Sequence, residues 1–507
     1  MSEDRIPRQP NILLIMTDQH RLSGVGAYGP TPCRTPNLDA LARQGVRFET
    51  AYTTCPVCTP ARASVITGLY PHAHGMTGNP HQLGACVSEL PDHPDLLPHR
   101  LQRAGYRLGF TGKWHLGTGQ ESVRRPGSYI TMPNKPSLPE HFGFTGHQQA
   151  RDGKGHTCPE YEAYLTEHGF SGKTRPPEPG AAAPSHNYGI LAGPEESTYS
   201  WFLADQTMRL MDDFSQGEAP FFIWHNFSGP HHPWLVPQEA YDLYKDVRIP
   251  EWPNFRWDSQ GTPGPHQMNI HPRGGELQWA DWERAIRHYY AYVTLIDRQI
   301  GRMLDHLDAL GLRQDTLTIF TADHGETLGS HGGLTNKGWS HFEEIQRVPL
   351  IVAPPGPPAP GCRTPGSAAP EFASLLDIYP TILDYAEAGF PTEQIHGMSL
   401  KPLLDGTPAA WRDAAFVEFF AVFHMATTLF TARKGNMKYG WNSVGQDELY
   451  DLDADPWETA NVIDAPDYRE RAEEMRLTMA QWAHRTGAAI RGWNSPGGDT
   501  IPGLPKP

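Results

Sequence analysis

The stretch Ile12-Leu13-Leu14-Ile15-Met16-Thr17-Asp18-Gln19 is a short apolar run that ends in two polar residues. A run of this length with polar residues at its end is typical of a strand buried in the middle of a sheet. In open α/β sheets, functional side chains gather just beyond the carboxyl ends of such strands. Residues 12–17 therefore predict a central strand, with Asp18 and Gln19 as candidate site residues at its end.

Four more runs of this kind, rich in β-branched or aromatic residues, occur at 107–111, 221–226, 317–322 and 348–353. Helix-like stretches alternate with them, at 37–44, 62–67, 198–214 and 285–310. In the last of these, apolar residues recur at helical spacing. Strands and helices that alternate along the chain predict an α/β fold, with a mostly parallel sheet sandwiched by helices.

The chain of 507 residues is long enough for one large domain and a smaller one. We predict a catalytic α/β domain over 1–405, in which the Gly-, Pro- and His-rich segment 118–197 is an insertion near the site. A smaller α+β domain is predicted over 406–507. It has strand-like runs at 415–420, 427–432 and 437–441, a helix over 468–485 and an irregular tail over 494–507.

The composition argues against several classes of partner. A net charge of −15 speaks against nucleic acid or an anionic membrane surface, because both require a basic face. No run approaches the roughly 18 apolar residues of a membrane span, and residues 12–16 are too short for the core of a signal peptide. Six cysteines in this length are typical of reduced thiols, so we predict a cytoplasmic protein.

Three polar clusters follow predicted strands. Asp18 and Gln19 follow the first, Asp323 and His324 follow 317–322, and His231 lies in the loop after 221–226. Carboxylates, an amide oxygen and an imidazole are suitable ligands for a divalent cation. The alternative is that Asp18 and Asp323 merely cap turns, which an isolated Asp after a strand does more often. Two such doublets in one chain weaken that alternative without removing it.

Cys58 precedes a helix-like run, so it is expected near a helix N-terminus, where backbone N–H groups favour an anion. Arg62, one turn later, supplies a permanent positive charge and a forked donor. Two other interpretations stay open at this point. The cysteine could be a small buried apolar residue, or a reactive thiolate with a histidine base nearby.

The stretch Cys58-Thr59-Pro60-Ala61-Arg62, continuing to Thr67-Gly68, resembles the sulfatase signature Cys-x-Pro-x-Arg-x-x-x-x-Thr-Gly. Further segments agree with that family in the same order along the chain, at 35–39, 112–117, 230–233, 321–325, 337, 347–350 and 448–452. Over residues 10–465 the chain is similar to the formylglycine-dependent sulfatases of the alkaline phosphatase superfamily. This resemblance implies an alkaline-phosphatase-like fold.

In that family a maturation enzyme oxidises the signature cysteine to formylglycine (3-oxoalanine), whose hydrate attacks sulfur. The second hydroxyl of the hydrate then allows collapse to the aldehyde with release of sulfate. By matching positions, the modified residue is Cys58 and the metal ligands are Asp18, Gln19, Asp323 and His324. The catalytic residues would be Cys58, Arg62, Lys113, His115, His231 and Lys337, and the substrate would be bound by Asn79, Lys113, His231 and Lys337.

The resemblance also implies a role for each of these side chains. Arg62 would orient the hydrated aldehyde, and Lys113 and Lys337 would neutralise charge on the non-bridging oxygens of the sulfate. His115 would hold or deprotonate the second hydroxyl, and His231 would be the general acid toward the leaving oxygen.

Two positions depart from the commonest family pattern. Many sulfatases have a second Asp in place of Gln19 and an Asn in place of His324. The Gln/His pair also occurs in phosphonate monoester and phosphodiester hydrolases of the same superfamily. A less anionic, slightly softer site favours Ca²⁺, with Mn²⁺ or Mg²⁺ as alternatives. Lys113 and His115, which the phosphonate hydrolases lack, favour sulfate esters.

The expected function is thus arylsulfatase-like hydrolysis of a small-molecule sulfate ester by a chain that acts as a homo-oligomer, a dimer or a tetramer. One alternative is a phosphonate monoester or phosphodiester hydrolase with the same nucleophile. Another is an unmodified, inactive relative that binds anions. The residues leave the ester itself open among aryl, sugar, steroid and choline sulfates.

Overall fold

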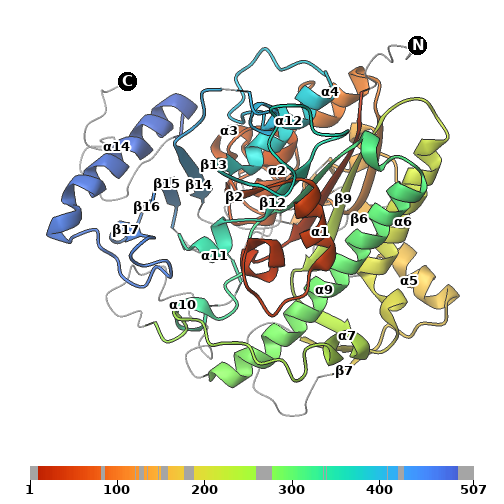
Figure 1. The fold of residues 1–507 in the computed structure, drawn as a ribbon, viewed down its shortest axis with the longest axis horizontal. Coiled ribbons are helices and arrows are strands. Elements are labelled where there is room, and N and C mark those ends of the chain that lie inside the picture. Colours follow the sequence, from red (N-terminus) through yellow and green to blue (C-terminus); the bar gives the residue numbers. More distant parts are fainter. Residues whose placement is uncertain are drawn as a thin grey trace.

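A computed structural model gives the fold (Figure 1). It describes residues 9–80, 86–119, 122–124, 131–133, 135–146, 148–149, 158–175, 188–257, 277–334, 336–337, 340–407, 409–420 and 427–488. None of the helices in these ranges is both long and apolar enough to cross a membrane.

The centre of the molecule is an eight-stranded sheet in the order β13-β2-β12-β11-β1-β9-β3-β6. Its strands are β1 (Asn11–Asp18), β2 (Val46–Tyr52), β3 (Arg107–Lys113), β6 (Gln148–Gln149), β9 (Phe221–Pro230), β11 (Thr316–Ala322), β12 (Leu350–Ala353) and β13 (Ala368–Ser374). β1 pairs in parallel with β11 and β9, and β3 and β13 also pair in parallel with their neighbours. Only β12 runs antiparallel to the strands beside it. The predicted mostly parallel sheet is therefore confirmed.

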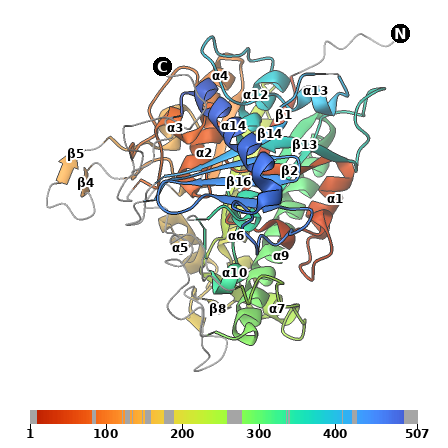
Figure 2. The same cartoon turned by 90° about the vertical axis from the view of Figure 1, so that its left-hand side faces the viewer.

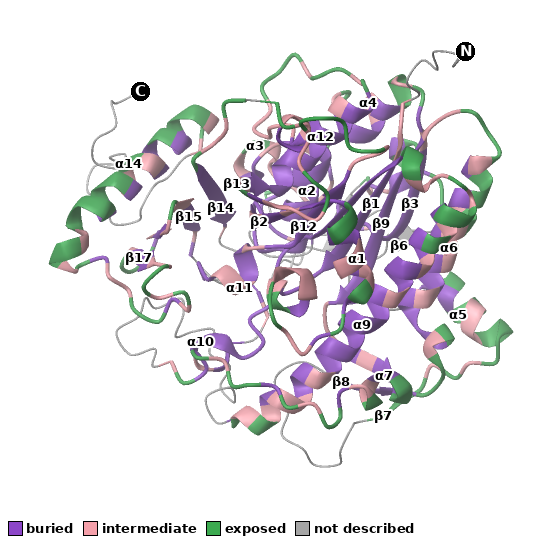
Figure 3. Cartoon of the chain, in the orientation of Figure 1, coloured by how far each residue is buried: buried purple, intermediate pink, exposed green. Residues whose placement is uncertain are grey.

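β1 explains why the sheet is covered on both faces. Leu13 and Ile15 pack into one apolar core, whereas Ile12, Leu14 and Met16 pack into the other. Successive side chains of a strand point to opposite faces, so an unbroken apolar run requires a layer of helices on each side. The central strands are accordingly buried along their length (Figure 3).

The two helical layers come from different parts of the chain. One face carries α1 (Pro36–Gln44), α6 (Tyr199–Ser215) and the long α9 (Trp279–Ala309), and the other carries α2 (Cys58–Thr67), α4 (Leu97–Arg103) and α12 (Ile378–Tyr385). Shorter helices are α3 (Pro71–His74), α5 (Pro159–Glu167), α7 (Gln238–Asp242), α10 (Ser330–Gly333), α11 (Glu343–Gln346) and α13 (Lys401–Leu404).

The C-terminal part forms a second, antiparallel sheet in the order β14-β15-β16-β17. Its strands are β14 (Ala414–Phe419), β15 (Leu429–Lys434), β16 (Met437–Asn442) and β17 (Glu448–Asp451). α14 (Arg469–Thr486) packs across this sheet through a small apolar core that also includes Tyr70 and Leu376. Figure 2 shows α14 and this sheet beside the central layers. The predicted α+β character of this region is confirmed, while the boundary at 405/406 stays a prediction.

Between α4 and α6 the chain forms short elements: β4 (Ser122–Arg124), β5 (Thr131–Pro133), β7 (Thr174–Arg175) and β8 (Tyr188–Leu191). β8 joins β7 and β10 (Trp234–Pro237) in a three-stranded sheet. The predicted insertion over 118–197 lies partly outside the described residues, as does the tail over 494–507.

Most predicted elements are found within a few residues of their expected bounds, and three differences have physical causes. α2 begins at Cys58, one turn earlier than predicted, because Pro60 is compatible with the first turn of a helix. β2 and β13 were not predicted, because polar residues interrupt their apolar pattern. Trp114 and Trp234 are fully buried in the core.

Candidate active site

The two predicted polar doublets lie side by side because β1 and β11 are parallel neighbours. Thr17 is paired with Ala322, so Asp18 and Asp323 leave the sheet at the same edge. The backbone N–H of Gln19 donates to Oδ1 of Asp323 at 3.0 Å, and the N–H of Asp323 donates to the carbonyl of Thr17 at 3.1 Å. Gln19 has a φ of 62°, a left-handed conformation that turns the chain sharply at this point. The doublets thus form one continuous site.

Cys58 is the first residue of α2 and is buried. Four side chains from different segments surround its sulfur. Sγ lies 3.0 Å from Nζ of Lys337, 3.4 Å from Nε2 of His324, 3.6 Å from Nζ of Lys113 and 3.7 Å from Oδ1 of Asp18. Asn79, predicted to contact substrate, accepts the backbone N–H of Thr59 through Oδ1 at 3.1 Å.

Arg62 lies beneath this cluster and is fully buried. Its guanidinium contacts Oδ2 of Asp323 at 2.9 Å and Oδ2 of Asp18 at 3.4 Å, so it bridges the two carboxylates. It also donates to the carbonyl of Lys113 at 3.0 Å and to Oδ1 of Asn226 at 2.7 Å. Every part of the forked donor is therefore used to hold the ends of strands β1, β3, β9 and β11 together.

His324 is oriented by its own backbone. Its Nδ1 lies 3.0 Å from the carbonyl oxygen of Gly325, which fixes this nitrogen as the donor and leaves Nε2 toward the carboxylates. Nε2 is 3.5 Å from Oδ1 of Asp323 and 3.9 Å from Oδ1 of Asp18. One ligand atom from each of Asp18, Cys58, Asp323 and His324 lies within 4.8 Å of all the others, an arrangement that could hold a metal ion.

Electrostatics in the site favour anions. Burial and the Asp18 carboxylate raise the pKa of the Cys58 thiol, but Lys113, Lys337 and His324 outweigh them and lower it to about 5. Burial also raises the pKa of Asp18, yet the two lysines hold it well below its usual value. For Asp323, burial and the nearby Asp18 raise the pKa. The site is thus locally cationic in a chain whose net charge is −15.

The two predicted histidines lie at the ends of neighbouring strands. His115 follows β3, has a φ of 54°, and its carbonyl accepts the hydroxyl of Thr59 at 2.6 Å. His231 follows β9, and its Nδ1 contacts the carbonyl of His232 at 2.7 Å, which leaves Nε2 for another partner. Burial lowers the pKa of both rings, helped by Lys113 at His115 and by Lys337 at His231. Both imidazoles are therefore neutral at pH 7 in the absence of an anion.

Asn226 and Glu326 belong to the site although the sequence did not single them out. Asn226, within β9, holds Arg62, and the carboxylate of Glu326 accepts a hydrogen bond from Nε2 of Gln19. A polar residue at the end of a predicted strand was a usable signal for Asn226. For Glu326, the only signal was its place two residues after His324.

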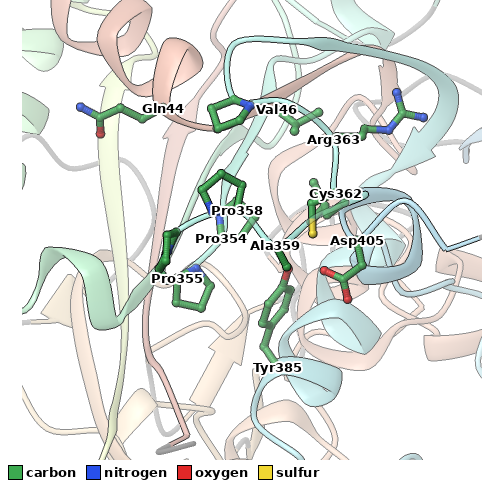
Figure 4. A pocket seen from close by; sticks show the side chains of 15 residues that line it. Gln44, Val46, Pro354, Pro355, Pro358, Ala359, Cys362, Arg363, Tyr385 and Asp405 are labelled. Carbon is green, nitrogen blue, oxygen red and sulfur yellow. The ribbon is translucent and has the colours of Figure 1, made fainter. Parts of the chain in front are cut away.

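A cavity of about 180 Å³ between the start of β2 and the proline-rich loop at 354–358 is not part of this site (Figure 4). Its lining includes Val46, Cys362, Tyr385 and Asp405, and none of the predicted site residues. The chemistry is concentrated at the carboxyl ends of β1, β3, β9 and β11 instead.

Comparison with known proteins agrees with this geometry. A model of the sulfatase family matches residues 10–388, and a model described as "N-sulphoglucosamine sulphohydrolase, C-terminal" matches residues 329–485. The chain is 28% identical over 492 residues to an arylsulfatase of Clostridium perfringens, covering 93% of this chain and 94% of that protein. It is 30% identical over 484 residues to a choline-sulfatase of Rhizobium meliloti, covering 90% of this chain and 83% of that protein.

Among solved structures, the phosphonate monoester hydrolase of Agrobacterium radiobacter is similar, with a TM-score of 0.76 and 26% identity. The likeness covers 94% of this chain and 96% of that one, which confirms the predicted alkaline-phosphatase-like fold. Because the family model spans most of the chain, and because the signature segment from Cys58 to Gly68 lies at the centre of the site, the chain belongs to the sulfatase family and is a sulfuric ester hydrolase.

Proposed function

We propose that this chain hydrolyses sulfate esters with a formylglycine nucleophile made from Cys58, assisted by a divalent cation. The observation that carries the proposal is the convergence of Lys337, Lys113 and His324 on Sγ of Cys58, at 3.0, 3.6 and 3.4 Å. A thiol buried as a small apolar residue would not be surrounded by charged groups. A nucleophile that must attack an anionic ester would need them.

The donor set fits a hard or borderline cation. Asp18, Asp323 and His324 supply two carboxylates and an imidazole whose atoms lie together, and Gln19 supplies an amide oxygen at the same strand end. Oxygen-rich ligands favour Ca²⁺, and the imidazole is compatible with Mn²⁺, with Mg²⁺ a further alternative. When bound, such an ion would act as a Lewis acid toward the nucleophile and toward a sulfate oxygen.

One hydroxyl of the hydrated aldehyde at position 58 would lose its proton, attack sulfur and displace the alcohol or phenol, which takes up a proton. Loss of the proton from the second hydroxyl would then re-form the aldehyde and expel sulfate. In this proposal Lys113 and Lys337 neutralise the non-bridging oxygens, since both ammonium groups already point at the nucleophilic position. Arg62 holds Asp18 and Asp323 in place and adds positive charge beneath the nucleophile.

Two neutral histidines are available for proton transfer. Nδ1 of His115 is buried and has no hydrogen-bond partner among the described residues, so it can accept a proton from the second hydroxyl. Nε2 of His231 is left open by the contact of Nδ1 with His232, so a protonated ring could donate to the leaving oxygen. For Asn79, the contact of Oδ1 with the N–H of Thr59 supports a role in shaping the start of α2 beside the substrate.

A second candidate is hydrolysis of phosphonate monoesters or phosphodiesters by the same groups. Gln19 and His324 favour it, and so does the likeness to the Agrobacterium radiobacter hydrolase. Sulfate esters and these phosphorus esters are both tetrahedral anions. In this proposal, a preference for sulfate depends on the additional cation of Lys113 and the imidazole of His115, both of which are buried in the site.

The test compares specificity constants on one enzyme preparation. The chain is co-expressed with a formylglycine-generating enzyme and assayed with nitrophenyl sulfate, bis-nitrophenyl phosphate and a phenylphosphonate monoester. We expect the highest kcat/KM for the sulfate. A higher value for either phosphorus ester would replace the sulfatase assignment with the second candidate.

Mass spectrometry tests whether an unmodified, anion-binding protein is the better description. The peptide that contains Cys58 should be about 18 Da lighter when the thiol has become an aldehyde. An unmodified peptide together with absent turnover of all three esters would support a binding protein. The six free cysteines fit the reducing, cytoplasmic setting that we propose, and a homo-oligomer remains part of the proposal.

A further inference from the structure

Glu326 is a buried carboxylate directly behind one of the proposed cation ligands. Its side chain is fully buried, two residues beyond His324, in the segment that follows β11. Oε2 accepts a hydrogen bond from Nε2 of Gln19. No ion pair of the Glu326 carboxylate is found among the described residues; its oxygens are held by the amide of Gln19, the hydroxyl of Thr327 and two backbone N–H groups.

The contact with Glu326 decides which end of the Gln19 amide faces the site. An amide can bind a cation only through its oxygen, and rotation by half a turn would present the NH₂ group instead. An ionised carboxylate accepts hydrogen bonds and donates none, so Glu326 selects the NH₂ end. Oε1 of Gln19 then points to the opposite side, where it accepts Nζ of Lys337 at 2.9 Å.

The other oxygen of Glu326 holds the segment that carries Lys337. Oε1 accepts the backbone N–H of Asn336 at 2.7 Å and that of Leu328 at 3.1 Å. Asn336 has a φ of 75°, and the next residue is Lys337, whose ammonium lies 3.0 Å from Sγ of Cys58. One carboxylate thus fixes a cation ligand with one oxygen and the backbone beside Lys337 with the other.

We propose that Glu326 is a positioning residue that orients the Gln19 amide and strengthens its oxygen as a ligand. The inference rests on the proposed function, in which Gln19 binds the cation. A carboxylate that accepts the amide N–H polarises the amide and increases negative charge on Oε1, as a carboxylate does for a metal-binding histidine. An aspartate at position 19 would place a negative charge directly in the site. Here the carboxylate belongs to Glu326 and is separated from the site by the neutral amide of Gln19.

The test exchanges donor and acceptor between the two positions. In Glu326→Gln the new amide has only one acceptor oxygen. That oxygen can accept the hydrogen bond from Gln19 or those from the N–H groups of Leu328 and Asn336, but not both. In the double variant Gln19→Glu with Glu326→Gln, the amide donates to the new carboxylate and its oxygen still accepts both backbone N–H groups. A carboxylate oxygen then faces the cation.

The measurement is the dissociation constant of Mn²⁺ or Ca²⁺ for the full chain after chelation, by electron paramagnetic resonance or calorimetry, with no substrate present. We expect Glu326→Gln to weaken binding by about 10- to 100-fold, and the double variant to restore wild-type affinity or exceed it. Ser330→Ala is the matched control. Ser330 lies in the same segment, where its hydroxyl accepts Nη1 of Arg21 at 2.9 Å, and among the described residues it makes no side-chain hydrogen bond to Gln19 or Glu326.

The outcomes separate this inference from the function it rests on. Gln19→Ala reports on the ligand itself. Weaker binding in Gln19→Ala with unchanged binding in Glu326→Gln overturns the positioning role and leaves the proposed function standing. Unchanged binding in Gln19→Ala overturns both the ligand assignment and the inference. An equal loss in Ser330→Ala, or no rescue in the double variant, shows a general effect of the segment and also overturns the inference.

Discussion

In the active site, charged side chains from separate segments turn toward one atom, whereas at the junction with the C-terminal sheet each cation is bound to carboxylates of the protein itself. We use junction for three contacts: Lys438 with Glu343 and Glu458, Arg412 with Asp377, and His72 with Glu418. Arg412 meets Asp377 with two parallel hydrogen bonds, at 2.6 and 2.9 Å. Lys438 is fully buried between two carboxylates.

In the ion pairs of the active site, three cations, on Arg62, Lys113 and Lys337, share two carboxylates, on Asp18 and Asp323. At the junction every cation has a carboxylate to itself, and Lys438 has two. We therefore expect an anionic ligand to complete the first arrangement, whereas the second needs none. Substitutions in the site should therefore affect activity more than stability, and substitutions at the junction should do the opposite.

The largest expected effect is that of Cys58→Ala, which should reduce kcat/KM for nitrophenyl sulfate by roughly 10⁴-fold or more, because it removes the nucleophile. The melting temperature should stay at the wild-type value, since one buried sulfur is lost from among charged groups. Cys33→Ala serves as the control, because Cys33 is buried in the opposite core. Appreciable turnover by Cys58→Ala would contradict the proposed nucleophile.

The next effect is on stability. Lys438→Met should lower the free energy of unfolding by about 3–5 kcal/mol, because it leaves Glu343 and Glu458 buried without their common cation. Denaturant unfolding measures the change, and kcat of the folded fraction should be preserved. Lys434→Met is the matched control on the neighbouring strand. Its partly exposed pairs with Asp413 and Glu474 should contribute about 1 kcal/mol or less.

Lys113→Met tests the same distinction with a substitution in the active site. It should lower kcat by about 10²–10³-fold, because one of the cations that neutralise the reacting oxygens is lost. Its stability should fall less than that of Lys438→Met, since Asp18 retains Arg62 and Lys337. Denaturant unfolding of both variants compares their losses in free energy of unfolding. A drop in stability as large as that of Lys438→Met would break the distinction between site and junction.

The smallest effect is a pH dependence of the junction. Burial opposes protonation of His72, but the contacts with Glu418 and with the carbonyl of Thr486 outweigh it and raise its pKa above 6.5. The folded state therefore binds this proton more tightly than the unfolded state. Its stabilising contribution is complete below pH 6.5 and is lost as the pH rises through the higher folded value.

Thermal unfolding between pH 5 and pH 9 measures this contribution. The wild type should lose stability on the alkaline side of neutrality more steeply than His72→Gln, which keeps hydrogen-bonding groups but has no titrating ring. Identical slopes for the two proteins would show that His72 does not carry a proton at the junction.

The sequence located three residues of the candidate site better than it located the strands that support them. Asp18, Asp323 and Cys58 could be placed together because parallel strands end at one edge and because the signature segment is local. β2 and β13 were not predicted, because neither has a continuous apolar run and their burial comes from tertiary contacts. The antiparallel direction of β12 has no signal in its residues either.

Glu326 shows why the supporting shell of a site is hard to predict. Its importance depends on the direction of one hydrogen bond, from Nε2 of Gln19, and on two backbone N–H groups of a segment without regular structure. None of these contacts follows from periodicity or composition. The roles of individual site residues likewise remain proposals that the variants above can test.

The burial of α2 has a consequence for the order of events during synthesis. Its residues from Cys58 to Ile66 are all buried, and part of the surface that covers them comes from α12 (Ile378–Tyr385). Any enzyme that oxidises Cys58 must reach it before those residues pack. At about 5–20 residues per second, the roughly 300 residues that separate the two helices take about 15–60 s to translate. We therefore expect the proposed nucleophile to be made before α12 packs on α2, during synthesis, and not in the finished molecule.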